Sequence, residues 1–442
     1  MRKDGSAALP TRLRLWLAPG MGVKRFVFIA ILGVLVTAAG VVAGALWLLA
    51  DARAAIATPV ETVLVSRDWR RFGGWASLLA VLVGLGTGMA AITALNRSLL
   101  SNWMPRPRDA AVVLHQRLLR SRGPRIVAFG GGTGLSNLLR GLRDGTSNLT
   151  AVVTVADDGG SSGRLRAAFG MPAPGDLSDC LAALSDDEQQ VGRLMQYRFE
   201  RGDAFKGHTF GNMLITTVSE VEGDILRATR ALNRMLDISG AVWPVTASAV
   251  TLTAEKAGGV RVEGESRIAS VPGRVDRLHL EPQDVPAAPE VTEAVASADL
   301  IVLGPGSLFT SVVAPLLVPG VGSALREASA PIVFVCNIMT EAGETDGMDA
   351  AEHVTAIHTH LGRWPDIVIV NDVPVDASRR DAYRGEDAEE VRIDRSALAL
   401  LGLHVEAAPL LAEGRYAQHD SVRLADVVLD VAQRVRRGER FA

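Results

Sequence analysis

The chain has 442 residues and a formal net charge of −3. This length allows two or three structural units with a large core, and the charge argues against a general nucleic-acid-binding protein, which would carry a basic field. The two cysteines, Cys180 and Cys336, have no metal-ligand spacing, so we expect two small buried thiols in a reducing compartment.

Two long uncharged runs near the N-terminus, at residues 26–50 and 72–95, predict transmembrane helices. About 20 apolar residues suffice to cross the hydrocarbon core. In the second run, Gly84, Gly86 and Gly88 would let a neighbouring helix approach closely. We interpret the pair as a membrane anchor. The alternatives are two buried core helices or a cleaved signal peptide, although the first run is longer than a usual signal core.

Lysines and arginines precede the first run and follow the second, whereas the loop between them mixes arginines with acidic residues. The positive-inside bias therefore places both termini in the cytoplasm. This predicts a basic cytoplasmic segment (1–25), a transmembrane hairpin (26–95), a basic juxtamembrane linker (96–123) and a cytoplasmic domain (124–442). The linker can form a short basic amphipathic helix at the membrane surface or a solvated helix.

From Pro124 onward, short β-branched runs alternate with helical patterns, which predicts an α/β domain with a doubly wound, mostly parallel sheet. The candidate strands are 125–129, 150–155, 300–303, 332–336 and 367–370. Between residues 245 and 271 the pattern changes to alternation around Gly258-Gly259, which predicts an inserted β-hairpin.

The first of these strands runs into a turn with four glycines, followed by leucines at helical spacing. Free backbone N–H groups and the positive end of a helix dipole would then meet at one point, which suits a phosphate. The same turn also serves simply to pack a helix on a strand. It lacks the third glycine of the dinucleotide motif, and the chain has no P-loop sequence, so NAD-dependent hydride transfer is a minor hypothesis and a P-loop ATPase is disfavoured.

Polar loops follow several strands. The loop after residue 155 offers two carboxylates for sugar hydroxyls or a divalent cation, hydroxyl donors and an arginine for a phosphate, although capping aspartates in a plain turn would look similar. Asp176 either binds a ligand or caps a helix. His208 is a candidate acid–base group or a structural hydrogen-bond partner. Asn212 either hydrogen-bonds to the edge of a base or ribose or caps its helix.

A second glycine turn after residue 303 opens another helix with three hydroxyls in reach, and a further polar loop follows residue 336. Loops that follow parallel strands converge at the carboxyl edge of the sheet, where α/β proteins bind ligands. The sequence therefore predicts a phosphorylated ligand at this edge.

The loop set resembles the gluconeogenesis-factor (YvcK-like) family, which belongs with the 2-phospho-L-lactate transferase (CofD-like) superfamily. The resemblance covers Pro124 to the C-terminus and rests on six strings in this order: GGGTGLS, TVADDGGSSGRLR, PGDLSDCLAALS, KGHTFGN, LGPGSLFTS and CNIMTEAGETDG. It implies a Rossmann-like three-layer α/β/α fold, binding of UDP-N-acetylglucosamine, and an influence on cell shape and cell-wall synthesis. Family members are usually soluble, so the added transmembrane hairpin is a departure.

The resemblance also implies roles for individual residues. The first glycine turn would lie along the nucleotide diphosphate. Asp157 and Asp158 would lie near the phosphates or sugar of the ligand or hold a cation, and the second glycine turn would close the far side of the nucleotide pocket. The candidate ligand-binding residues are Gly131, Gly132, Thr133, Gly134, Asp157, Asp158, Ser161, Ser162, Arg164, His208, Asn212, Gly304, Gly306, Ser307 and Thr310.

Two functions from different classes follow. The first is a membrane-anchored regulator that binds a nucleotide sugar. The second is a magnesium-dependent, 2-phospho-L-lactate transferase-like enzyme with a nucleotide-activated donor, in which Asp157 and Asp158 surround the Mg²⁺. The expected partners are a nucleotide sugar and, through the two spans, membrane lipid, but no nucleic acid; homo-oligomers and cell-wall synthesis proteins stay open.

Overall fold

The computed structural model describes residues 23–53, 67–100, 110–383, 385, 387–439 and 441. The chain divides into two compact units, Met1–Gln116 and Arg117–Ala442. Most of the predicted N-terminal segment, of the loop between the two runs and the first part of the linker lie outside the described residues.

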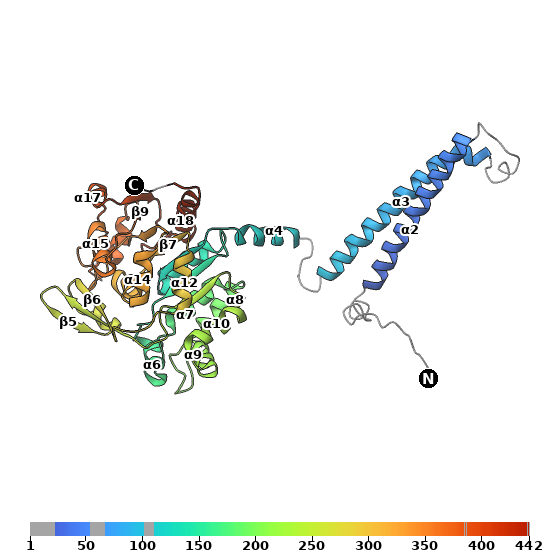
Figure 1. Cartoon of the computed structure of the whole chain (residues 1–442). Helices are drawn as coiled ribbons and strands as arrows, with labels where there is room; N and C mark the ends of the chain where they lie inside the picture. Colours follow the sequence, from blue (N-terminus) through green and yellow to red (C-terminus); the bar gives the residue numbers. More distant parts are fainter. Residues whose placement is uncertain are drawn as a thin grey trace. The chain divides into compact units, whose positions relative to one another are not determined.

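The N-terminal unit is a pair of long helices, α2 (Val23–Arg53) and α3 (Arg67–Leu100), which pack along each other (Figure 1, blue). Both are long and apolar enough to cross a membrane, over Arg25–Leu49 and Phe72–Ser98. Large apolar side chains point outward, for example Phe28 (69% exposed) and Trp75 (74% exposed). A helix pair with such an apolar outer surface needs an apolar environment.

Glycines set the spacing between α2 and α3. A Cβ atom on Gly84 would lie 2.7 Å from the carbonyl oxygen of Gly33, and one on Gly33 would lie 2.7 Å from the backbone nitrogen of Gly88. The expected close approach therefore occurs at Gly84, and the backbone of Gly88 lies close to Gly33, although a Cβ atom on Gly88 itself would meet nothing within 4 Å. A Cβ atom on Gly86 would also meet nothing within 4 Å; two residues along a helix turn it by about 200°, away from the partner.

We expect Gly84→Leu to separate the two helices, whereas Gly86→Leu leaves them in place. The readout is a disulfide between cysteines introduced at Gly44 and Ser77, where a Cβ on Gly44 would lie 3.4 Å from the Cβ of Ser77, close to the 3.5–4.5 Å that a disulfide needs. The bond should form in the Gly86→Leu chain and be lost in the Gly84→Leu chain. Equal cross-linking of the two would contradict the packing.

The second unit is built on a seven-stranded parallel sheet with the order β10-β9-β8-β7-β1-β2-β3. Its strands are β1 (Ile126–Gly130), β2 (Leu149–Val153), β3 (Ala241–Pro244), β7 (Leu300–Leu303), β8 (Ile332–Val335), β9 (Ile367–Asn371) and β10 (His404–Ala408). The five predicted strands are confirmed. The two edge strands, β3 and β10, were not predicted.

Helices cover both faces of this sheet, which confirms the three-layer α/β/α fold. The chain moves from β1 to β2 in one direction and from β7 to β8 in the other, and right-handed crossovers then place the connecting helices on opposite faces. One layer contains α5 (Gly132–Leu142), α7 (Gly175–Leu184) and α18 (Ser421–Arg436); the other contains α12 (Pro289–Ser297), α14 (Pro319–Glu327) and α15 (Ala350–Leu361).

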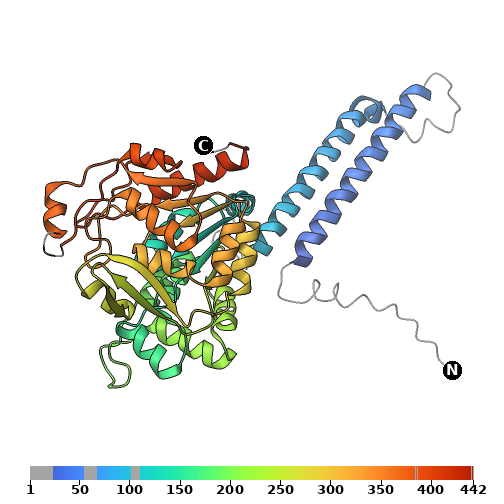
Figure 2. The ribbon, with the colours of Figure 1, turned by 60° about the vertical axis from the view of Figure 1, so that its left-hand side comes forward.

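A smaller antiparallel sheet with the order β5-β4-β6 is inserted into this frame (yellow in Figure 2). Strands β4 (Thr251–Lys256) and β5 (Val260–Glu263) form the predicted hairpin, and both glycines of its turn have positive φ. The third strand, β6 (Val275–Glu281), pairs with β4 and was not predicted.

The remaining helices lie in the connections. They are α4 (Ala110–Ser121), α6 (Gly160–Phe169), α8 (Glu188–Met195), α9 (Phe210–Glu222), α10 (Ile225–Met235), α11 (Glu265–Ser270), the π-helix η2 (Leu308–Val313), α13 (Ala314–Leu316), α16 (Ala377–Tyr383) and α17 (Arg395–Leu400). The leucines of α5 that the sequence places on one face are all buried, and so are Cys180 and Cys336, as expected.

Candidate functional site

The carboxyl ends of β1 and β7 form the natural ligand site of this fold. These strands are neighbours, and the chain leaves them in opposite directions, so a crevice opens at the switch point. A hollow of about 380 Å³ lies there, within the size range of small-molecule sites. We call it the switch-point hollow; it is lined mainly by Gly131–Gly134, Asn137, Pro305–Ser307, Asn337–Glu341, Tyr383 and residues 417–419 and 421.

The two glycine turns build this hollow by approaching each other closely. A Cβ atom on Gly134 would lie 2.5 Å from the carbonyl oxygen of Pro305, so no larger residue fits without moving one loop. Gly131 caps helix α5 without any side-chain hydrogen bond, and Gly132 has a φ of +55°. Asp176 accepts a hydrogen bond from the N–H of Gly132, so a phosphate at this end of α5 would use the next N–H groups, those of Thr133 and Gly134.

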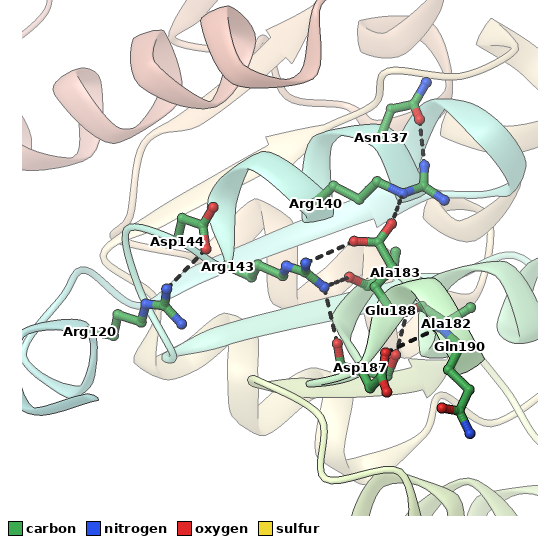
Figure 3. Close-up of polar contacts among 11 residues, drawn as sticks. Arg120, Asn137, Arg140, Arg143, Asp144, Ala182, Ala183, Asp187, Glu188 and Gln190 are labelled. Carbon is green, nitrogen blue, oxygen red and sulfur yellow. Dashed lines mark hydrogen bonds and ion pairs between the residues drawn. The ribbon is translucent and has the colours of Figure 1, made fainter. Parts of the chain in front are cut away.

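Helix α5, which carries these N–H groups, is held by an ion-pair network (Figure 3). Glu188, in the first turn of α8, lies between Arg140 of α5 and Arg143, the C-cap of α5, and pairs with both. Arg143 also donates to the carbonyl oxygens of Ala183 and Ser185 at the end of α7. Three helices are therefore tied together behind the glycine loop, which fixes the direction of the α5 axis.

A second hollow of about 350 Å³ lies next to the first. We call it the acidic hollow, because Asp157, Asp176 and Asp179 line it; its other lining residues include Ser161, Ser162, Ser178, Gln196, Arg198, Thr209 and Asn212. Asp176 lies where the two hollows meet, since its carboxylate accepts a hydrogen bond from the N–H of Gly132. Burial, together with Asp157 and Asp179, raises the pKa of Asp176 to about 8. Asp176 is not the cap of α7, which begins after Pro174.

A hydrogen-bond network holds the wall of the acidic hollow. The Asn212 side chain donates to the hydroxyls of Ser161 (3.1 Å) and Ser162 (3.2 Å), while Thr209 caps α9. The Ser161 hydroxyl lies 3.0 Å from Nδ1 of His208. Burial and the cations Arg164 and Arg198 lower the pKa of His208, which favours a neutral ring.

The predicted site residues thus divide into three groups. The switch-point hollow contains Gly131, Gly132, Thr133, Gly134, Gly306 and Ser307. The acidic hollow contains Asp157, Ser161, Ser162 and Asn212. The other five line neither hollow. His208 contacts Ser161, Arg164 donates to the carbonyl oxygen of Lys206, and Thr310 donates to Glu344. Asp158 accepts from the N–H of Ser266, and Gly304 turns the chain with a φ of +84°.

Asp157 and Asp158 do not form a ready magnesium site. Oδ1 of Asp157 accepts from the N–H of Gly159, whereas Asp158 turns to the N–H of Ser266, at the start of α11. The described part of the chain holds no group of three His, Cys, Asp or Glu side chains placed to bind a metal ion. The two adjacent carboxylates therefore do not share an ion in this arrangement, because they point to different elements.

Three glutamates gather behind the second glycine turn. Burial is the main cause that raises the pKa of Glu344 to about 8 and of Glu265 to about 7, and it also raises the pKa of Glu341. Mutual repulsion among these carboxylates adds to the shift of Glu344. Thr310 donates to one oxygen of Glu344, and the other oxygen is buried without a partner.

This cluster predicts that the protein loses stability as the pH rises from about 5 to 8. In the unfolded chain these carboxyl groups ionise near pH 4, whereas in the folded protein they keep their protons to pH 7–8. The folded state therefore binds more protons in this window, and the free energy of unfolding falls with increasing pH. We expect Glu344→Gln to flatten the fall and, at pH 8.5, to be more stable than the parent by on the order of 2 kcal/mol.

Urea unfolding of both chains at several pH values measures this difference. The same pH slope in the two chains would contradict it.

Sequence reasoning missed one wall of the switch-point hollow. Tyr383 ends α16, Gln418 and His419 lie just before α18, and Ser421 is its first residue. No motif marks these residues, and the packing of α18 on α5 brings the last three to the glycine loop. Burial lowers the pKa of His419 to about 4, so its ring is neutral in the folded protein.

Comparisons with known proteins agree with this fold. The sequence profile of the family described as 2-phospho-L-lactate transferase CofD matches residues 126–411. The gluconeogenesis factor of Bacillus subtilis is 41% identical over 70% of this chain and 98% of its own length. A crystal structure of a UPF0052-family protein from Bacillus halodurans is 40% identical, with a TM-score of 0.67, and covers 69% of this chain and 99% of that chain.

The N-terminal helices also have counterparts. A Deinococcus radiodurans relative is 42% identical over 97% of this chain and 93% of its own length, so its alignment must include α2 and α3. The Bacillus proteins match about 70% of the chain. On the matched family profile, the shared fold and these identities, the chain belongs to the gluconeogenesis-factor (YvcK-like) family, within the 2-phospho-L-lactate transferase (CofD-like) superfamily, and carries two long apolar helices before the family domain.

Proposed function

We propose that this protein is a membrane-anchored regulator that binds a nucleotide sugar, with UDP-N-acetylglucosamine as its ligand, and couples the supply of that sugar to cell-wall synthesis and cell shape. The observation that carries the proposal is the switch-point hollow, where the N-terminus of α5 and the Gly304-Pro305-Gly306 turn face each other. The membrane anchor is supported by the apolar outer surface of α2 and α3.

A diphosphate in the switch-point hollow would be bound by backbone groups and not by cations. Glu341 is the one carboxylate among the described lining residues, and burial raises its pKa. Among the described residues that line the hollow there is no lysine or arginine. A diphosphate would therefore rely on the N–H groups and the dipole of α5, as glycine-loop sites do. Hydroxyl and amide side chains, such as Ser307, Ser311 and Asn337, would complete the contacts.

The acidic hollow supports the sugar part of the ligand. Carboxylates, hydroxyls and an amide line it, and these groups exchange hydrogen bonds with sugar hydroxyls. Asp176 joins the two hollows, so one ligand with a diphosphate and a sugar could occupy both.

Calorimetric titration of the full chain in lipid nanodiscs tests the proposal. UDP-N-acetylglucosamine, GDP and NAD would each be added with and without magnesium. We expect heat with the UDP-sugar and none with NAD. No heat with the UDP-sugar at millimolar concentration would contradict the proposal.

The acidic hollow also favours the alternative function, a transferase that moves a phosphorus-containing group from a nucleotide-activated donor to an acceptor. It offers a place for an acceptor beside the diphosphate. Turnover of such a donor, lost in Asp157→Asn, would establish this function in place of a purely regulatory one.

A further inference from the structure

Helix α4 (Ala110–Ser121), which joins the two units in the sequence, exposes large apolar side chains. Leu114, Leu118 and Leu119 are 58%, 50% and 55% exposed. Leu114 and Leu118 are four residues apart and so share one face of the helix. A cluster of exposed leucines on a short helix marks a surface that another apolar phase covers.

Arginines gather at the C-terminal end of this helix. A guanidinium nitrogen of Arg436, at the end of α18, donates to the carbonyl oxygen of Arg122 at 2.9 Å. Arg122, Arg436 and Arg437 are all exposed. By contrast, Arg117 and Arg120 pair with Asp186 and Asp144. Among the described residues, Arg122, Arg436 and Arg437 form no ion pair with a carboxylate, although Arg436 lowers the pKa of Asp299 and Arg437 that of Glu439. The positive charge available to a partner therefore lies mainly on these three arginines, which come from opposite ends of the domain sequence.

The chain length limits where α4 can be. Helix α3 ends at Leu100 and α4 begins at Ala110, and the nine residues between them reach at most about 35 Å when fully extended. If α3 crosses the membrane, α4 stays within that distance of the bilayer surface, and the effective concentration of lipid around it is high.

We propose that α4 is an interfacial helix, whose leucines enter the cytoplasmic leaflet while Arg122, Arg436 and Arg437 contact anionic lipid headgroups. The partner is an anionic bilayer, because apolar side chains beside exposed arginines match its hydrocarbon and its charge. This inference rests on the membrane anchoring proposed above.

The placement has a consequence for the site. Arg122 lies just before β1, at the amino edge of the parallel sheet, whereas both hollows lie at or beyond its carboxyl edge. Helix α18 likewise runs from Ser421, in the switch-point hollow, to the arginines at its other end. Docking through α4 and these arginines would therefore leave both hollows open to the cytosol.

Site-directed fluorescence on the full chain tests this. An environment-sensitive probe is attached to L118C, and V221C on α9, where Val221 is 78% exposed, serves as the matched control. Cys180 and Cys336 are buried and should not react with the probe. The chains are placed in nanodiscs of phosphatidylcholine alone or mixed with phosphatidylglycerol.

We expect the probe at position 118 to shift to the blue and to be quenched by a lipid-attached quencher, most strongly with phosphatidylglycerol, and the probe at 221 to remain water-like. R436E/R437E should reduce the effect of phosphatidylglycerol. A water-like spectrum at 118 would overturn the proposal, and so would a blue shift without lipid quenching, which would mean that a second copy of the chain covers α4.

Incorporation into the discs is measured separately, by co-migration of protein and lipid in gel filtration. A chain that enters the discs and shows a water-like probe at 118 contradicts only the role of α4. A chain that does not enter them contradicts the anchor and, with it, this inference.

Discussion

Gly134→Ala is expected to weaken binding of UDP-N-acetylglucosamine about 100-fold, which corresponds to about 2.7 kcal/mol. The added methyl group would lie 2.5 Å from the carbonyl oxygen of Pro305 and 2.8 Å from its carbonyl carbon. Both are backbone atoms, so the two turns that form the switch-point hollow must move apart. The N–H groups of α5 would then no longer face the second turn at the spacing that the ligand requires.

The stability of the same variant gives a second readout. Gly134 lies in the first turn of α5, and replacing glycine by alanine inside a helix normally stabilises it by up to about 1 kcal/mol. We expect the opposite sign at Gly134 because of the collision. Gly192, within α8, is the matched control, since a Cβ atom there meets nothing within 4 Å. Unchanged affinity and raised stability in Gly134→Ala would contradict the close approach.

Lys256→Met is expected to lower the free energy of unfolding of the α/β unit by about 3–5 kcal/mol. Lys256 is 2% exposed, and its ammonium group donates to three carbonyl oxygens, those of Ile268, Val271 and Gly343. Methionine has a similar volume but no donor, so all three acceptors would stay buried without a partner. This one side chain ties the three-stranded sheet to the loop after β8.

Urea denaturation, followed by tryptophan fluorescence, measures the loss. Lys206→Met is the control, because the side chain of Lys206 is exposed. A loss below about 1 kcal/mol in Lys256→Met would mean that water replaces the ammonium group at the three carbonyls. Because the loop after β8 carries Glu341 and Glu344, the variant should also shift the pH dependence of stability.

The buried strands could be predicted from sequence because their residues are apolar without interruption. β1, β7, β8 and β9 are buried at every position, and a continuous β-branched run between turns indicates such a strand. The edge strands give no such signal. Every residue of β10 is only partly buried, and its sequence, HVEAA, mixes polar and small residues.

The site was predictable as an edge of the sheet but not as two hollows. The glycine turns and the polar loops lie where the parallel topology brings them. Which way a side chain points from a loop depends on hydrogen bonds made by other segments. Asp157 and Asp158 are neighbours in sequence, yet Asp158 points to α11, because it accepts a hydrogen bond from the N–H of Ser266. Asp176, whose position in the sequence also suggests a helix cap, lies at the boundary between the two hollows.

The position of α18 has a consequence for biosynthesis. Ser421 and Leu424 of this helix line the switch-point hollow together with Gly131–Gly134 of the first turn. The ribosome must therefore complete α18 before the hollow exists, whereas α2 and α3 emerge long before it. Under the proposed anchoring and ligand, a nascent chain would reach the membrane before it could hold a nucleotide sugar, and the ligand would then act only on finished molecules.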